Sequence, residues 1–218
     1  KTCSYAVDWG RKNLKIPQNL KQPIAIIVNS GNANVFTGLN GEATVQKTIS
    51  SVTHHLQTAV ENVFVASTGV IGEYLPFEKI TSQMEVLVKN LKPNSFLQAA
   101  NAIMTTDTFP KGIHRQIKLG ETKVKINGIA KGSGMIAPNM ATMLVFIFTD
   151  ISIEKNVLQE IVMRCNNQSF NCITVDSDTS TSDSLFLIAT GKAKMSKIKS
   201  LEDPRAIKFQ KYLTKAML

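Results

Sequence analysis

A threonine that follows a run of small residues is the strongest candidate for a reactive group in this chain. Thr142 comes directly after Ala141 and before the apolar run Met143–Phe148. A chain that cleaves itself before a threonine exposes a hydroxyl nucleophile and, on the same residue, an α-amine that acts as the base. The residues therefore favour an N-terminal threonine nucleophile, while a purely structural threonine at the start of a buried strand stays open as the alternative.

The α-amine of such a threonine suits general-base catalysis. Its reference pKa is about 7.7 to 8.0, whereas that of a lysine side chain is about 10.4, so only the α-amine is substantially neutral at working pH. Histidine, the usual base, occurs only three times, and no Gly-x-Ser-x-Gly motif is present. A Ser-His-Asp triad is therefore disfavoured.

Three other candidate sites fail on their spacing. Lys131-Gly-Ser-Gly134 lacks the upstream glycine of a phosphate-binding P-loop. The acidic loop Asp176–Asp183 has the alternate spacing of a calcium loop, but Thr181 stands where that loop needs glycine. The neighbouring residues His54 and His55 fall on a predicted helix, where they point about 100° apart and cannot chelate one metal. We therefore expect no metal site and interpret the acidic loop as structural.

Composition excludes several classes of protein. Of the 218 residues 43% are apolar and 19% charged, which excludes an intrinsically disordered chain. No apolar run approaches the roughly 18 residues of a membrane span. The net charge of +9 comes from 21 lysines and only four arginines among 25 basic residues, mostly spaced singly, which disfavours nucleic-acid binding. Three cysteines, an odd number, indicate free thiols in a reducing compartment, so we expect a cytoplasmic protein.

Alternating strand-like and helix-like segments must position the candidate residues. The segments predicted as strands are Ile24–Val28, Val63–Ala66, Ile117–Ala130, Met143–Phe148, Ile173–Val175 and Leu185–Ala189. The polar run Asn29–Asn34 after the first strand predicts a loop, and Gly120 and Asn127-Gly128 predict two turns within the third segment. Helical spacing between these segments makes the class α/β or α+β.

Five blocks of the sequence resemble, in the same order, the ornithine acetyltransferase family, the bifunctional glutamate N-acetyltransferases of the arginine pathway. One block surrounds the candidate nucleophile and reads KGSGMIAPNMATML, from Lys131 to Leu144. The other four are Asn29–Asn34 with Thr37-Gly38, Ser67–Glu73 with Leu75-Pro76, Thr105–Thr108 with Pro110-Lys111, and Asp176–Asp183. The last block departs from the family pattern at Ser177 and Ser182, so we leave it out of the site.

The resemblance implies an acyltransferase that cleaves itself between Ala141 and Thr142. Such an enzyme moves an acetyl group from N2-acetyl-L-ornithine to L-glutamate through an acetyl-threonine intermediate. It needs no metal and no cofactor, and acetyl-CoA as a further donor stays open. Two alternatives also stay open: an aminopeptidase or amidase with the same nucleophile, and an inactive fragment of the family.

The resemblance also assigns a role to each matching residue. Thr142 is the nucleophile and contacts the substrate, while Thr68 and Gly69 stabilise the oxyanion. Thr108 and Lys131 contact the substrate, and the lysine suits a substrate carboxylate. From the residues alone, Thr68-Gly69 could equally be a tight turn, Thr108 a helix-end hydroxyl and Lys131 a surface charge.

The family's fold has stacked sheets flanked by helices, of the ornithine acetyltransferase and D-aminopeptidase-like type. The resemblance implies that an alpha segment, residues 1–141, and a beta segment, residues 142–218, stay associated and form a dimer of heterodimers. Family members extend beyond both ends, and their downstream D-G-E-G-A block has no counterpart here. We therefore expect residues 1–218 to be a single, truncated catalytic domain without nucleic-acid or membrane partners.

Overall fold

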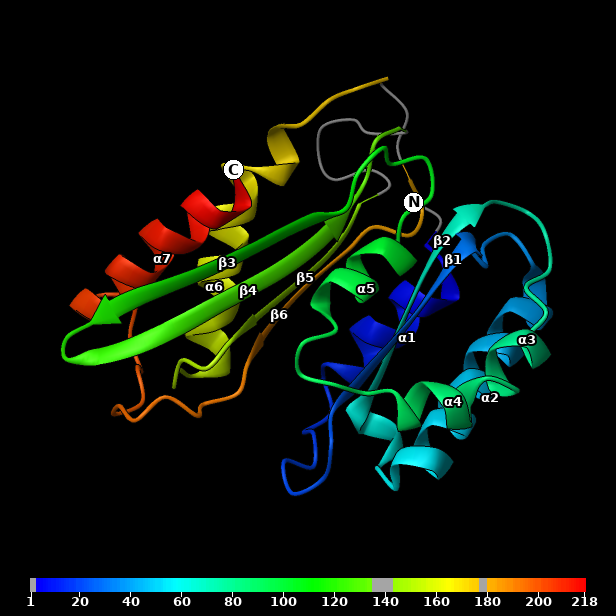
Figure 1. The fold of residues 1–218 in the computed structure, drawn as a ribbon, viewed down its shortest axis with the longest axis horizontal. Coiled ribbons are helices and arrows are strands. Elements are labelled where there is room, and N and C mark those ends of the chain that lie inside the picture. The colour runs from blue at the N-terminus through cyan, green and yellow to red at the C-terminus, as the bar shows by residue number, and fades with distance from the viewer. Residues whose placement is uncertain (1–2, 135–142, 177–179) are drawn as a thin grey trace. The chain divides into compact units, whose positions relative to one another are not determined.

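The computed structural model describes residues 3–134, 143–176 and 180–218. They form two compact units, one comprising residues up to 105 together with 181–184 and the other comprising residues 106–180 together with 185–218. Each unit has its own β-sheet and its own helices (Figure 1). The mixed α/β class expected from the sequence is therefore confirmed.

The first unit is built on two parallel strands. β1 (Ala25–Asn32) pairs with β2 (Val63–Val70), and parallel neighbours need a long crossover between them. Here the crossover contains α2 (Gly38–Leu56) and the 3-10 turn η1 (Val60–Asn62). The other helices described in this unit are α1 (Tyr5–Asn13), α3 (Glu78–Thr81), α4 (Met84–Lys89) and α5 (Phe96–Ala102).

The core of the first unit holds the apolar halves of the strands. Val45, Ile49 and Val52 recur at helical spacing on α2, and all three are buried. They belong to one cluster with Val63 and Val65 of β2. Because this cluster anchors the amino-terminal half of β2, the polar carboxyl end of the strand is held in a defined place.

The polar run after the first predicted strand is not the loop that we expected. β1 continues through Asn32, and β2 continues through Val70, because the parallel pairing extends into the small polar residues of both strands. Polarity indicates contact with water or polar groups, but it does not specify the backbone conformation. The predicted loop is therefore wrong for Asn29–Asn32.

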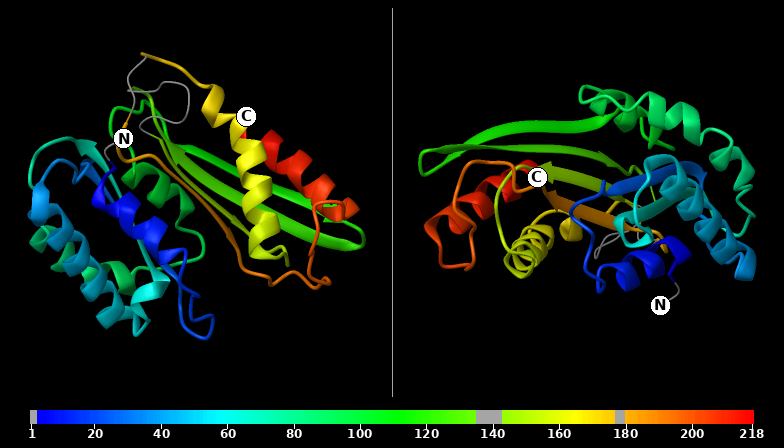
Figure 2. Two further views of the ribbon diagram at one scale, coloured as in Figure 1. Left: turned by 180° about the vertical axis from the view of Figure 1, so that it is seen from behind. Right: turned by 90° about the horizontal axis from the view of Figure 1, so that it is seen from below.

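The second unit is built on a four-stranded sheet whose order is β3-β4-β5-β6. Its strands are β3 (Lys111–Leu119), β4 (Thr122–Lys131), β5 (Leu144–Thr149) and β6 (Ser184–Ala189). α6 (Lys155–Asn167) and α7 (Pro204–Met217) cover one face of the sheet, as the view from behind shows (Figure 2). A short 3-10 turn, η2 (Phe170–Cys172), follows α6.

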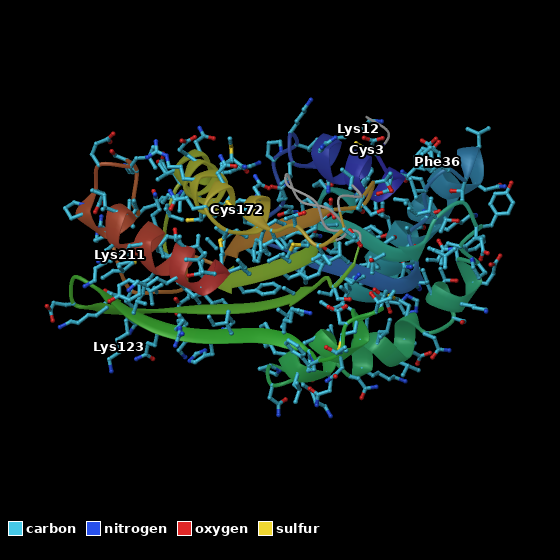
Figure 3. The ribbon with its side chains drawn as sticks, turned by 90° about the horizontal axis from the view of Figure 1, so that it is seen from above. Cys3, Lys12, Phe36, Lys123, Cys172 and Lys211 are labelled. Carbon is cyan, nitrogen blue, oxygen red and sulfur yellow. The ribbon has the colours of Figure 1, made fainter. Side chains whose placement is uncertain are left out.

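Alternation along the strands explains how this sheet packs. Ile117 on β3 and Val124 and Ile126 on β4 turn toward the helices, where they are buried in one cluster with Ile161 of α6 and Phe209 of α7. Lys123 alternates with these residues and is exposed, and Lys211 on α7 is exposed as well (Figure 3). These two lysines are therefore solvated.

One of the two predicted turns in the β3–β4 segment is wrong. Gly120 does lie in the hairpin turn, with φ +60°, but Asn127-Gly128 continues as strand. A Cβ on Gly128 would lie 3.2 Å from Ile113 Cγ2 and 3.5 Å from Ile147 Cγ1. Glycine suits this position because branched side chains of both neighbouring strands leave little room for a Cβ. The strand predicted at Ile173–Val175 is also absent from the structure.

No helix among the described residues is long and apolar enough to span a membrane. All three cysteines are unpaired thiols, as expected from their odd number. Burial raises the pKa of the Cys165 thiol, although its hydrogen bonding with Thr214 acts in the opposite direction. Because the thiolate is the reactive form, this cysteine is a poor nucleophile.

Candidate active site

The carboxyl ends of β1 and β2, in the first unit, hold one group of predicted site residues. Gly69 adopts φ +131° and lies opposite Gly31 in the parallel pairing. A Cβ on Gly69 would overlap the carbonyl carbon of Gly31 and lie 2.5 Å from the amide nitrogen of Asn32. Both the dihedral angle and the close approach exclude any other residue without a shift of the backbone.

Thr68 precedes this glycine and is 3% exposed. It lies at the end of a strand anchored by the hydrophobic core, so the threonine and the glycine are held rigidly together. Thr68-Gly69 is thus paired strand, and the alternative of a tight turn is wrong. A strand end of small residues lets a hydroxyl and backbone amides approach a developing negative charge. The pair Thr68-Gly69 is therefore suited to an oxyanion hole in its local geometry.

Asparagine side chains stabilise the segment that follows β1. The Asn29 amide donates to the carbonyl oxygen of Asn32 at 2.8 Å, and the backbone amide of Asn34 donates to Asn32 Oδ1 at 2.7 Å. The Asn32 amide in turn donates to the carbonyl oxygen of Glu73 at 3.1 Å, beyond the end of β2. Hydrogen bonds of these asparagine side chains thus take the place of backbone strand pairing where both strands end.

A second group of predicted site residues lies at one end of the four-stranded sheet of the other unit. Lys131 is the last residue of β4 and is 1% exposed, whereas Thr108 is exposed before β3. Burying an ammonium group costs far more than leaving it in water, and such burial occurs where the charge is paired. The alternative interpretation of Lys131 as a surface charge is therefore wrong.

A carboxylate that the sequence interpretation missed contacts the residue that follows this lysine. Asp107 Oδ1 accepts a hydrogen bond from the backbone amide of Gly132 at 2.8 Å. The same oxygen forms an ion pair with Lys111 Nζ at 2.6 Å. Next to it, the Thr106 and Ser133 hydroxyls lie 2.8 Å apart. Two neighbouring contacts thus join the segment before β3 to the segment after β4.

The predicted nucleophile and cleavage site, Thr142 and Ala141, lie outside the described residues. Thr68 and Gly69 belong to the first unit, while Thr108 and Lys131 belong to the second. Within the second unit, the contacts of Asp107 link the neighbourhoods of Thr108 and Lys131. Within the first unit, Thr68 and Gly69 are adjacent along β2.

Comparisons with known proteins match this chain over its full length. The model described as ArgJ family matches residues 1–218. The arginine biosynthesis bifunctional protein ArgJ of Gluconobacter oxydans is 45% identical over 210 residues, which cover 96% of this chain. The protein of the same name from Ruegeria pomeroyi is 53% identical over 169 residues, or 78% of this chain.

The chain belongs to the ArgJ family. It spans about half the length of the curated relatives, 49% of the Gluconobacter protein and 41% of the Ruegeria protein. Two solved structures are also similar, each over 65% of this chain. They are the Bacillus halodurans ArgJ, with a TM-score of 0.56 and 34% identity, and the Mycobacterium tuberculosis ornithine acetyltransferase in complex with ornithine, with a TM-score of 0.52 and 30% identity.

Proposed function

We propose that this ArgJ-family chain carries the catalytic threonine of an enzyme that moves the acetyl group of N2-acetyl-L-ornithine to L-glutamate. The observation that carries the proposal is the strand end at Gly69, where two strands approach too closely for any side chain. Such a strand end suits oxyanion stabilisation, which acyl transfer requires. The family match and a structural neighbour solved with ornithine support the substrate class.

The proposed reaction starts with cleavage of the peptide bond between Ala141 and Thr142, which frees the α-amine. The Thr142 hydroxyl then attacks the acetyl carbonyl while the α-amine takes its proton. Thr68 and Gly69 stabilise the oxyanion of the tetrahedral intermediate. The α-amine returns the proton to the departing ornithine amine, and an acetyl-threonine ester remains.

The second half of the reaction reverses these steps with a different amine. The α-amino group of glutamate attacks the ester carbonyl, the oxyanion forms on the same donors, and N-acetylglutamate leaves as the Thr142 hydroxyl regains its proton. We assign Lys131 to the carboxylate of the bound amino acid, with Thr108 as a further contact to substrate. The burial of Lys131 supports this role, since desolvation strengthens such a charge pair.

The sheet of the second unit explains how the two products of cleavage would stay together. β4 precedes the proposed cleavage point and β5 follows it, yet the two strands pair antiparallel from Ile126 opposite Thr149 to Lys131 opposite Leu144. Their side chains also share one buried cluster. Cleavage would therefore leave each segment contributing two strands to one sheet.

Mass spectrometry of the denatured protein tests the first step. We expect two fragments from the wild type, the second beginning at Thr142, and one uncut chain from Thr142→Ala. Thr174→Ala is a matched control, because Thr174 is an exposed threonine of the same segment. An uncut wild type, or cleavage of Thr142→Ala at the wild-type rate, would overturn the proposal.

Acceptor dependence tests the second step. With N2-acetyl-L-ornithine as the donor, the proposal predicts that ornithine release requires L-glutamate and yields N-acetylglutamate. Release at the same rate without an acceptor would instead select an aminopeptidase or amidase, and cleavage without turnover would select an inactive fragment. Two further assays complete the test. Replacing N2-acetyl-L-ornithine with acetyl-CoA measures which donors the enzyme accepts, and adding a chelator should leave the rate of acetyl transfer unchanged.

We also propose that the cut segments assemble as a dimer of heterodimers in the cytoplasm, with small molecules rather than nucleic acid or membrane as partners. The family membership supports this assembly. Sedimentation equilibrium of the processed protein measures it directly, since a single heterodimer and its dimer differ twofold in mass.

A further inference from the structure

The carboxylate of Asp107 lies at the junction of two segments that the sheet brings to the same end. The β3–β4 pairing begins with Lys111 opposite Ala130, so the residues just before β3 and just after β4 leave the sheet side by side. Asp107 belongs to the first of these segments, and Gly132 to the second. The contact between them therefore spans 25 residues of sequence and closes the end of the hairpin.

Burial makes this contact strong. The Asp107 side chain is 1% exposed, and its Oδ1 accepts from both the Gly132 amide and Lys111 Nζ. A buried carboxylate needs such donors because it has lost its hydration, and charge-assisted hydrogen bonds are about twice as strong as neutral ones. Lys111 is held in turn over the Phe109 ring, with Nζ 4.9 Å from the ring centroid.

The backbone at Gly132 shows what the carboxylate holds. Gly132 adopts φ +152° directly after β4 ends at Lys131, and the backbone bends at the two residues that follow. Its amide, no longer part of the strand pairing, donates to Asp107 instead. The neighbouring contact between the Thr106 and Ser133 hydroxyls, at 2.8 Å, restrains the next residue along the chain. The direction in which the chain leaves Lys131 is thus set by two side chains from before β3.

We propose that Asp107 is a positioning residue for self-cleavage: by holding the Gly132 amide, it fixes the chain where it leaves β4, upstream of the proposed cleavage between Ala141 and Thr142. The inference rests on the proposed function, and it adds a residue whose role is to direct the precursor rather than to contact substrate. Bond cleavage in a peptide requires a bent, restrained geometry, so loss of this anchor at one end of the segment slows cleavage.

Two variants of Asp107 test the proposal through the rate of processing. Asp107→Ala removes the acceptor and should slow cleavage of newly folded protein about tenfold or more, as expected for loss of one charge-assisted hydrogen bond. Asp107→Asn retains an oxygen for the Gly132 amide but loses the charge that attracts Lys111, so its rate should lie between those of the wild type and Asp107→Ala. Rates are followed by intact mass at a temperature where unfolding measurements show each variant folded.

Asp150→Asn provides the matched control. Asp150 Oδ1 also accepts from a backbone amide of β4, that of Lys125 at 2.8 Å, but this contact lies away from the segment that is cut. Its rate of cleavage should stay within about twofold of the wild type. Equal slowing in Asp150→Asn and Asp107→Asn would mean general destabilisation of the sheet and would overturn the inference.

Thr106→Val keeps the inference testable if Asp107→Ala does not fold. It removes only the hydroxyl contact with Ser133 and should slow cleavage about threefold, the effect of one weaker hydrogen bond. Wild-type rates in Thr106→Val and Asp107→Asn together would overturn the inference and leave the proposed function standing. A wild type that is never cut would overturn the proposed function itself, and this inference with it.

Discussion

The requirement for glycine differs between the two partners at the end of the parallel pair. Gly31 has φ +97°, but a Cβ there would meet nothing within 4 Å. Gly69 has both a positive φ and a backbone neighbour where its Cβ would lie. The steric need for glycine is therefore stronger at Gly69, which the family resemblance places in the oxyanion hole, than at Gly31.

Gly69→Ala should lower the free energy of unfolding by about 2 kcal/mol or more, because the new Cβ forces β1 and β2 apart. Acetyl transfer should fall by more than stability alone explains, since the shift moves the proposed oxyanion donors. Denaturant unfolding and the acetyl-transfer assay measure the two effects on the same preparation.

Gly72→Ala is a control that separates the strain of a positive φ from the overlap of a new Cβ with neighbouring backbone. Gly72 also has a positive φ, +87°, but a Cβ there meets nothing within 4 Å. We expect this control to cost about 1 kcal/mol, the strain of the dihedral angle alone. If both variants were equally stable, the close approach of the two strands at Gly69 would be refuted.

Residues were predictable from the sequence where the chemistry is local. Lys131 and the pair Thr68-Gly69 stand within blocks that resemble the family; the structure buries Lys131 and Thr68, while their roles stay predictions. Asp107 stands in such a block too, but its contact is with an amide 25 residues away. Nothing in the local pattern indicates that pairing, which is created only when β3 and β4 come together.

At the scale of elements, α7 has an explicit start signal. Asp203 caps the helix by accepting from the amide of Arg205 at 2.9 Å, and Pro204 occupies the first turn. The Arg205 guanidinium also donates to the Asp203 carboxylate and lowers the pKa of that carboxyl below its ordinary value. The helical spacing of the tail predicts this helix only from Lys208 and so misses the cap.

The lowered pKa of Asp203 has a definite sign for stability. A carboxyl whose pKa is lower in the folded state than in the unfolded state stabilises the fold above the unfolded pKa, about 3.9 for aspartate. This contribution is lost as the pH falls through the lower folded pKa. Asp203→Asn keeps a good capping oxygen but removes the charge, so it should reduce the loss of stability on acidification while changing the cap itself little.

Thermal unfolding of wild type, Asp203→Asn and Asp203→Ala from neutral pH to about pH 2.5 measures both effects. Asp203→Ala should lose about 1 kcal/mol at neutral pH through loss of the cap. Asp203→Asn should fall below the wild type at neutral pH by less than this and converge with it in acid. A constant difference between wild type and Asp203→Asn at every pH would rule out the charge effect.

Elements were predictable where an apolar pattern is continuous. The strand expected at Met143–Phe148 lies within a residue of β5, and the helical spacing of Ile153–Asn166 predicts α6 to within two residues. α1, by contrast, was not predicted from the pattern. It is held by side chains that donate to distant backbone, with Trp9 Nε1 2.8 Å and Asn13 Nδ2 3.2 Å from the carbonyl oxygen of Val63. Such tertiary hydrogen bonds leave no periodic signal.

At the scale of the whole molecule, the proposed cleavage divides the sequence without dividing the sheet. β3 and β4 fall in one product, and β5 and β6 in the other. The helices that cover the sheet, α6 and α7, both belong to the second product, yet they bury side chains of the first, such as Val124 and Ile126. Neither product could bury its apolar surface alone, so association should be obligatory rather than incidental.

Val145→Asp tests this dependence. Val145 lies opposite Ala130 in the β4–β5 pairing and is 2% exposed within the shared cluster. An unpaired carboxylate buried there should cost about 3 kcal/mol or more and separate the products or prevent their folding. Val175→Asp makes the same chemical change at an exposed position of the same product and should have little effect.

Size-exclusion chromatography of processed protein, with each peak resolved on a denaturing gel, should show both fragments in one peak for the wild type and Val175→Asp. Separate elution of the wild-type fragments would contradict a sheet shared between them, because six residue pairs join β4 to β5 across the cut.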